Sequence, residues 1–395
     1  MSLRKKIIVR APGRINLIGE HTDYNGGLAL PMAIDRYIEV TVRPRTDELL
    51  VLWSPEFGGI NLPLQDLRPA PGTWHTYVQG VCHALLEAGH RLGGFELDAG
   101  GNIPVGTGMS SSAALCCATV MALNALFELK LNRHEMALLA QRAEHTFAGV
   151  QCGLLDQYAC LFAKKGYALK MDFSTLQFDY IRVELPKHSL LLLDSAVKHS
   201  LAATEYNLRK QECRRALELV QVRYPRVTAM RNLSVSHLQE CVLHEDAVAY
   251  KRARFFLEEN SRVEQAVAAL KARDMAAFGR LLNESHRGLA DLYQVSCPEI
   301  EKLWRMAAVR DNFLGARLMG GGFGGCTLNL TKMPASGGLA SLGKEYAEFS
   351  GKDLKHYLLK SADGAQVTGH NAAHQLVVAD GPLSGAPAAL NPQTT

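Results

Sequence analysis

The alternation of apolar and polar side chains along the first hundred residues predicts β-strands. The clearest case is RYIEVTVRPR at residues 36–45, which alternates as a half-buried strand does. The strand near the start of the chain is expected to be short, because Pro12 and Gly13 interrupt it. The predicted strands lie at residues 5–12, 36–45, 49–54 and 94–101.

Segments whose apolar residues have the spacing typical of helices lie between and after these predicted strands. Residues 73–89 have it and end at Gly89, a residue that commonly caps helices. The segment after Ser112 is apolar on every side, so the helix it predicts must be buried. Asn132 with Glu135 three residues later forms a capping-box pattern that opens a helix over residues 133–148.

The second half of the chain has mainly helical periodicity. The exception is a glycine-rich stretch, with five glycines at residues 320–325, which leads into a strand. The predicted helices lie at residues 202–223, 246–258, 261–272 and 275–293.

A length of 395 residues favours two domains over one. We expect an N-terminal domain at residues 1–185 and a C-terminal domain at residues 186–367, because the strand-rich part ends near residue 185. Residues 368–395 lack aromatic side chains and are rich in Ala, Gly and Pro, so we expect a flexible tail.

Charge and cysteine content narrow the class of protein. A net charge of +4 is mild, and the basic residues near Arg209 and Arg214 follow a helical pattern, so no nucleic-acid partner is expected. No apolar run approaches the length of a membrane span, and the chain start lacks the apolar region of a signal peptide. Nine cysteines without a C-x-x-C pair indicate reduced thiols and a cytoplasmic location.

A polar segment, GRINLIGEHTDYNGG at residues 13–27, directly follows the first predicted strand. Glu20, His21 and Asp23 can together accept and donate several hydrogen bonds, which suits the hydroxyl groups of a sugar. Leu17 and Ile18 precede them as a buried anchor, which argues against an ordinary surface loop.

Residues 104–112 combine glycines and serines at the start of the buried helix. Backbone N–H groups at such a helix start bind anions, most often phosphate. The loop lacks the lysine of a Walker A motif, so a polyphosphate there would need other compensation, and Mg²⁺ held by hydroxyl and carboxylate oxygens would supply it. A tight turn with serine caps is the structural alternative.

Two acidic residues stand out for opposite reasons. Asp156 lies in an otherwise apolar stretch, where it would pair with a cation, neutralise or do chemistry. A helix cap or a structural salt bridge would explain it equally well. Glu144, judged by itself, is expected on the surface of a helix.

These segments resemble the signatures of a known family. Residues 13–31 are similar to the sugar signature of the galactokinases, and residues 101–114 (GNIPVGTGMSSSAA) resemble the phosphate-binding motif of the wider GHMP kinases. Residues 318–330 (LMGGGFGGCTLNL) resemble the third motif of that superfamily. The resemblance runs from about Arg10 to about Val367.

The resemblance implies an α+β fold of two GHMP-kinase-like domains with the active site in the cleft between them. It implies phosphorylation of the anomeric hydroxyl of α-D-galactose by ATP, with Mg²⁺ as cofactor, and we expect a monomer. Asp156 would be the catalytic base, with Arg14 near the transferred phosphate. The implied sugar ligands are Glu20, His21, Asp23, Gly153, Asp156 and Tyr206.

The resemblance also assigns the nucleotide and the metal. Trp74 and Tyr77 would lie near the adenine, and Ser112 and Glu144 would bind magnesium. The implied phosphate contacts are Gly106, Thr107, Gly108, Met109, Ser110, Ser111 and Ser112.

Two positions depart from the family pattern, and two other functions compete. Met109 replaces a leucine of similar volume, and Met319 replaces a threonine whose hydroxyl could contact substrate. A catalytically silent galactose sensor is disfavoured, because the serine–alanine stretch that such sensors alter is intact at residues 110–114. A kinase for a related sugar such as N-acetylgalactosamine stays open.

Overall fold

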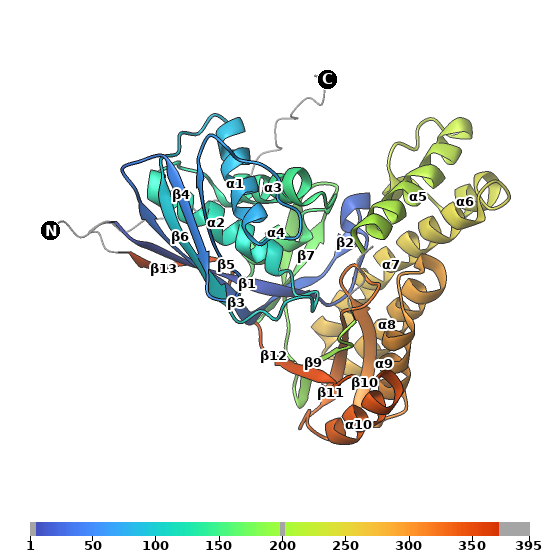
Figure 1. Cartoon of the computed structure of the whole chain (residues 1–395). Helices are drawn as coiled ribbons and strands as arrows, with labels where there is room; N and C mark the ends of the chain where they lie inside the picture. Colours follow the sequence, from blue (N-terminus) through green and yellow to red (C-terminus); the bar gives the residue numbers. More distant parts are fainter. Residues whose placement is uncertain (1–4, 198–201, 371–395) are drawn as a thin grey trace.

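A six-stranded sheet organises the N-terminal half of the chain. The computed structural model describes residues 5–197 and 202–370, and this sheet has the strand order β13-β1-β3-β6-β4-β5 (Figure 1). Its neighbouring strands are antiparallel, except that β4 and β6 run parallel. The strands are β1 (Ile7–Asn16), β3 (Pro31–Pro44), β4 (Leu49–Ser54), β5 (Gly58–Pro63), β6 (Phe95–Gly101) and β13 (Gln366–His370).

The first strand does not end at Pro12, so that prediction was wrong. β1 continues to Asn16, and its register with β3 shifts between Pro12 and Arg14. Gly13 lies so close to the Met109 carbonyl oxygen that a Cβ there would be only 2.7 Å from it. The irregularity therefore redirects the strand beside residues 104–112, which we call the serine-rich loop.

The helix α2 (Ser111–Phe127) packs against this sheet, and α1 (His75–Glu87) and α3 (Arg133–Ala143) pack against α2. Side chains on every face of α2 are buried, and the capping box of Asn132 and Glu135 is present at the start of α3, as predicted. The predicted helix 133–148 changes character near its end, because α3 passes into a π-helical turn at Glu144–Ala148. α4 (Leu155–Phe162) follows.

The C-terminal half contains a four-stranded antiparallel sheet, ordered β10-β11-β9-β12, and a layer of helices (Figure 1). A smaller sheet, β2-β7-β8, lies beside the first. The strands of these two sheets are β2 (Leu28–Ala29), β7 (Tyr167–Asp172), β8 (Gln177–Arg182), β9 (His188–Asp194), β10 (Phe313–Met319), β11 (Cys326–Lys332) and β12 (Lys355–Leu359). The helices are α5 (Ala202–Arg223), α6 (Val235–Cys241), α7 (Ala247–Ala272), α8 (Met275–Arg287), α9 (Pro298–Ala308) and α10 (Leu339–Ser350).

The helix predictions in this half need two corrections. The two helices predicted at residues 246–258 and 261–272 are one continuous helix, α7. The helix predicted at 275–293 ends at Arg287 and continues as a π-helical turn over Gly288–Tyr293. The sequence analysis did not identify α6, α9 and α10.

The two halves are joined by a shared core and by the last described strand. The largest hydrophobic cluster includes side chains from β1, α2, α7 and β11. β8 ends at Arg182 and β9 begins at His188, while β13 returns to pair with β1. Residues 368–370 of the predicted tail lie in β13, and residues 371–395 lie outside the described residues. Among the described helices, none has the length and apolar character to cross a bilayer.

Candidate active site

A cavity of about 410 Å³ opens where the polar segment, the serine-rich loop and the start of α4 meet. Every site residue predicted from the sequence lines it, except Trp74. Trp74 packs half-buried nearby and donates from Nε1 to the Gly58 carbonyl oxygen, whereas Tyr77, one turn along α1, does line the cavity. The other predicted lining residues are Arg14, Glu20, His21, Asp23, Gly106, Thr107, Gly108, Met109, Ser110, Ser111, Ser112, Glu144, Gly153, Asp156 and Tyr206.

A two-pronged ion pair joins Arg14 of β1 to Asp156 in the first turn of α4. Arg14 Nε donates to Oδ1 at 2.6 Å and a terminal nitrogen donates to Oδ2 at 2.8 Å. Burial acts to lower the pKa of Arg14, but the charges of Asp156 and Glu20 together with the hydrogen bond to Asp156 outweigh it, and the pKa ends above its ordinary value. This planar geometry is the strong form of an arginine–carboxylate contact, and it leaves further lone pairs on Asp156 for a ligand.

The serine-rich loop reaches the same carboxylate. Ser110 donates its hydroxyl to Asp156 Oδ2, and Arg14 donates to the Gly108 carbonyl oxygen. Gly106, Gly108 and Ser110 all have positive φ, which turns the chain sharply before α2 begins at Ser111. The free N–H groups at the start of α2 therefore lie beside the ion pair, where a phosphate would be stabilised.

His21 is held as a neutral ring. Its φ is +60°, and Nδ1 shares a hydrogen bond of 2.7 Å with the Tyr24 hydroxyl. Burial, followed by the charge of Arg209, lowers the His21 pKa to about 3. Nε2 is buried beside the Gly321 backbone and makes no hydrogen bond within the described residues, so a donor or acceptor from a ligand can complete it.

Glu20 has partners that the sequence analysis missed. Its Oε1 accepts from Arg317 and from the Gly320 backbone N–H, both at 2.8 Å. Arg317 lies wholly buried in β10 and also donates to the Asn16 and Leu17 carbonyl oxygens. An arginine in an apolar strand was the available signal, since a buried guanidinium requires acceptors. The glycine-rich third motif is thus bonded directly to the polar segment at residues 13–27.

Asp23 lies against the chain just before α4. Burial, followed by the Asp156 charge, raises the Asp23 pKa to about 7. Gly153 contacts it so closely that a Cβ at residue 153 would lie 2.3 Å from Asp23 Oδ2. Tyr206 of α5 packs its ring 5.2 Å from the His21 ring and forms the opposite side of this part of the cavity.

Glu144 is buried, so the prediction of a surface position was wrong. It begins the π-helical turn, accepts a hydrogen bond from Gln157 and is only 6% exposed. Burial raises the Glu144 pKa to about 7, while the Ser112 hydroxyl acts in the opposite direction. A carboxylate and a hydroxyl that meet in a cavity are hard oxygen donors, which fits Mg²⁺. Clusters of three or more His, Cys, Asp and Glu suited to a metal do not occur in the described parts of the chain.

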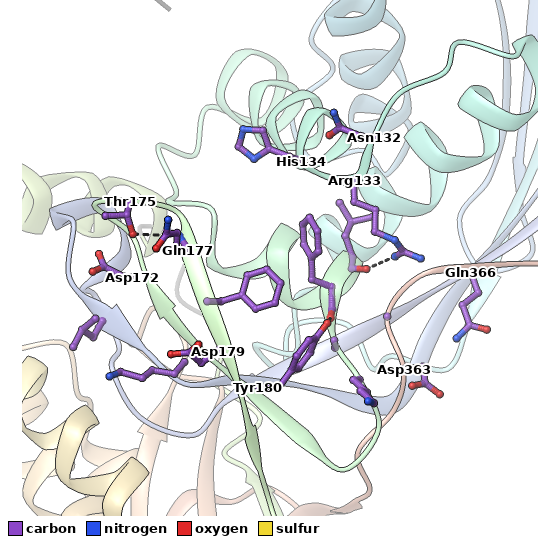
Figure 2. A pocket seen from close by; sticks show the side chains of 18 of the residues that line it. Asn132, Arg133, His134, Asp172, Thr175, Gln177, Asp179, Tyr180, Asp363 and Gln366 are labelled. Carbon is purple, nitrogen blue, oxygen red and sulfur yellow. Dashed lines mark hydrogen bonds between the residues drawn. The ribbon is translucent and has the colours of Figure 1, made fainter. Parts of the chain in front are cut away.

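A larger cavity, about 1300 Å³, lies elsewhere and contains none of the predicted site residues. It is bordered by the starts of α3 and β13, the end of α4 and the strands β7 and β8 (Figure 2). Its charged side chains include mutual ion pairs, such as Arg231 with Asp172 and Lys170 with Glu264.

Comparisons with known proteins agree on the family. The model of the galactokinase galactose-binding signature matches residues 3–44, and the models of the GHMP kinase N-terminal and C-terminal domains match residues 76–164 and 266–347. A galactokinase of Roseiflexus sp. (strain RS-1) is 40% identical over 371 residues, which cover 93% of this chain and 95% of that protein. Human galactokinase is 38% identical over 374 residues, which cover 92% of each chain.

Solved structures give the same result. The structure of Lactococcus lactis galactokinase complexed with galactose is similar with a TM-score of 0.86 at 34% identity, over 92% of this chain and 95% of that one. A mevalonate kinase, with a TM-score of 0.61 at 19% identity, shares the fold. The predicted α+β GHMP-kinase fold is therefore confirmed. The chain belongs to the galactokinases, within the GHMP kinase superfamily.

Proposed function

We propose how this cleft performs the reaction of its family. The chain is an enzyme that transfers the γ-phosphoryl group of ATP to the anomeric hydroxyl of α-D-galactose, which yields galactose 1-phosphate and ADP. The observation that carries the assignment to this cavity is the Arg14–Asp156 ion pair, which lies between the sugar segment and the serine-rich loop.

Asp156 is proposed to accept the proton of the anomeric hydroxyl as that oxygen attacks the γ-phosphorus. Arg14 balances the carboxylate charge and lies beside the loop that would hold the phosphates, so it would also stabilise charge on the transferring group. Phosphoryl transfer depends chiefly on positioning and electrostatics, and a general base adds roughly 10²–10⁴-fold.

Galactose is proposed to lie between the polar segment and α5. Asp23 and Glu20 would accept from its hydroxyls, and the unpaired Nε2 of His21 would meet another. Gly153 and Tyr206 would shape the remaining side. An epimer would leave one of these buried polar groups unpaired, which is how the site would discriminate against it.

ATP is proposed to place its phosphates on residues 106–112, where the N–H groups at the start of α2 are unpaired. Ser112 and Glu144 would hold Mg²⁺, which neutralises phosphate charge when bound. Tyr77 is better placed than Trp74 to contact the nucleotide, because only Tyr77 lines the cavity.

The experiment compares ATP consumption with galactose, N-acetylgalactosamine, glucose and arabinose. Turnover with galactose at least about tenfold above the other sugars is expected. Preferential turnover of N-acetylgalactosamine would replace the substrate assignment, and galactose binding without ATP consumption would indicate a sensor.

Three further proposals accompany the function. The cavity is built from one chain, which is compatible with a monomer, and sedimentation velocity tests this. The nine free cysteines suit the reducing cytoplasm. We retain two domains divided near residue 185, with β13 crossing back to the first sheet.

A further inference from the structure

The segment that carries the sugar ligands is a closed loop between Gly19 and Leu28. The Thr22 hydroxyl lies within hydrogen-bond distance of the carbonyl oxygens of both of these residues, at 2.9 Å and 2.7 Å, and shares its one proton between them. The Thr22 carbonyl oxygen accepts in turn from Asn25 and Gly27. Because the loop is bonded to itself, whatever fixes its two ends fixes the whole unit.

Both ends are held by neighbouring residues of α7, from the other half of the molecule. Glu259 Oε1 accepts from the Gly19 N–H at 2.9 Å, and Asn260 Oδ1 accepts from the Leu28 N–H at 2.6 Å. We call Glu259 and Asn260 the α7 clamp. The periodicity predicted two helices, 246–258 and 261–272, with only these two polar residues between them. In the structure they do not end a helix but contact the loop.

Glu259 is rigidly supported. It is fully buried, Oε1 also accepts from Ser285 of α8 at 2.7 Å, and Oε2 accepts from Arg262 at 2.7 Å. The arginine balances the carboxylate charge, which would otherwise be costly to bury. The carboxylate therefore has one orientation, and it directs Oε1 at Gly19.

The loop fits the clamp without spare room. Gly19 has a φ of +95°, and a Cβ there would lie 2.5 Å from the Leu28 carbonyl oxygen. A Cβ on Gly27 would lie 2.7 Å from Asn260 Oδ1. Small shifts of α7 would therefore move the loop rather than be absorbed by it.

We propose that Glu259 and Asn260 are positioning residues for galactose, because they fix the backbone from which Glu20, His21 and Asp23 reach the sugar. The inference rests on the proposed function of this cleft. Neither residue lines the cavity, so both act through the loop. Their loss should weaken galactose binding and spare the phosphate loop, which has separate supports.

The test compares Glu259→Leu and Asn260→Ala with wild type. Leucine is close in size to glutamate and has no oxygen to accept from Gly19. Because it also removes the Glu259 partner of Arg262, Asn260→Ala keeps the proposal testable if Glu259→Leu does not fold. The matched control is Val267→Ala, which removes buried volume from the same helix without touching the loop. The measurements are the KM for galactose, the KM for ATP, and hydrogen–deuterium exchange of the Gly19 and Leu28 amides.

Each clamp variant should raise the galactose KM about tenfold, corresponding to one lost hydrogen bond to a buried group. The ATP KM should stay within about twofold, and the bonded amide should exchange faster. Val267→Ala should lower thermal stability without raising the galactose KM relative to the ATP KM. A galactose KM within about twofold of wild type, or equal increases in both KM values, would overturn the clamp. If wild-type protein does not phosphorylate galactose, the proposed function fails, and unchanged amide exchange in the variants separately refutes the clamp.

Discussion

Replacement of Gly153 by alanine should selectively damage galactose binding. The new Cβ would lie 2.3 Å from Asp23 Oδ2 and 2.6 Å from its Cγ, whereas ordinary contact begins at 3.4 Å. Gly153 is not among the residues with positive φ, so alanine adds no backbone strain. The carboxylate of Asp23 must therefore move by about 1 Å, which is enough to break a hydrogen bond to a sugar hydroxyl.

The magnitude follows from the bond that is lost. A hydrogen bond to a charged group contributes about 1.5–3 kcal/mol, so the galactose KM should rise roughly 10- to 150-fold. The assay is coupled ADP production at pH 8, where Asp23 is ionised, with galactose and ATP varied separately. The ATP KM should change by less than about twofold.

Two comparisons isolate the clash. Gly343→Ala in α10 is the matched control, because its Cβ meets no atom within 4 Å. In an Asp23→Gly background all three clashing atoms of residue 23 (Oδ2, Cγ and Cβ) are absent, so adding Gly153→Ala should cost little more. The reasoning is refuted if Gly153→Ala leaves the galactose KM within about twofold of wild type, or if its effect is undiminished without Asp23.

Two other predictions follow from the buried carboxylates. Because burial raises the Asp23 pKa to about 7 from 3.8, the empty protein should lose stability as the pH rises between these values, where Asp23 ionises in the unfolded chain but stays protonated in the folded one. Asp23→Asn should remove that part of the loss in a thermal-denaturation series, and identical pH dependence of Tm in both proteins would contradict the assignment. Glu144→Gln should raise the magnesium concentration for half-maximal activity at least about tenfold, and an unchanged magnesium titration would exclude ligation by Glu144.

The sequence pattern predicted helices and strands well where a segment had a single, uninterrupted periodicity. The strands at residues 36–45 and 49–54, the buried helix after Ser112 and the capping box at Asn132 all have local causes and are present. The strand β1 and the helix α7 were truncated or split because polar or irregular residues interrupt them. At both places the interruption serves the site: Gly13 lets the chain approach Met109, and Glu259 with Asn260 contacts the sugar segment.

The residues that the sequence analysis missed act across long separations. Arg317 donates a hydrogen bond to Glu20, and Glu259 accepts one from the Gly19 N–H, and in both pairs the two residues are far apart in the sequence. Glu144 was misplaced because its burial depends on the π-helical turn and on Gln157, neither of which has a periodic signal. The motifs identified residues that line the same cavity. The residues that hold them in place, such as Arg317 and Glu259, were visible only in the tertiary structure.

The central claim is that Asp156 accepts the proton from the sugar, and turnover of Asp156→Asn tests it most directly. Asparagine preserves the shape of the side chain but cannot take up the proton, so kcat should fall at least about 10²-fold while galactose binding by calorimetry persists. An Asp156→Asn protein that retains a tenth or more of wild-type turnover would contradict the account.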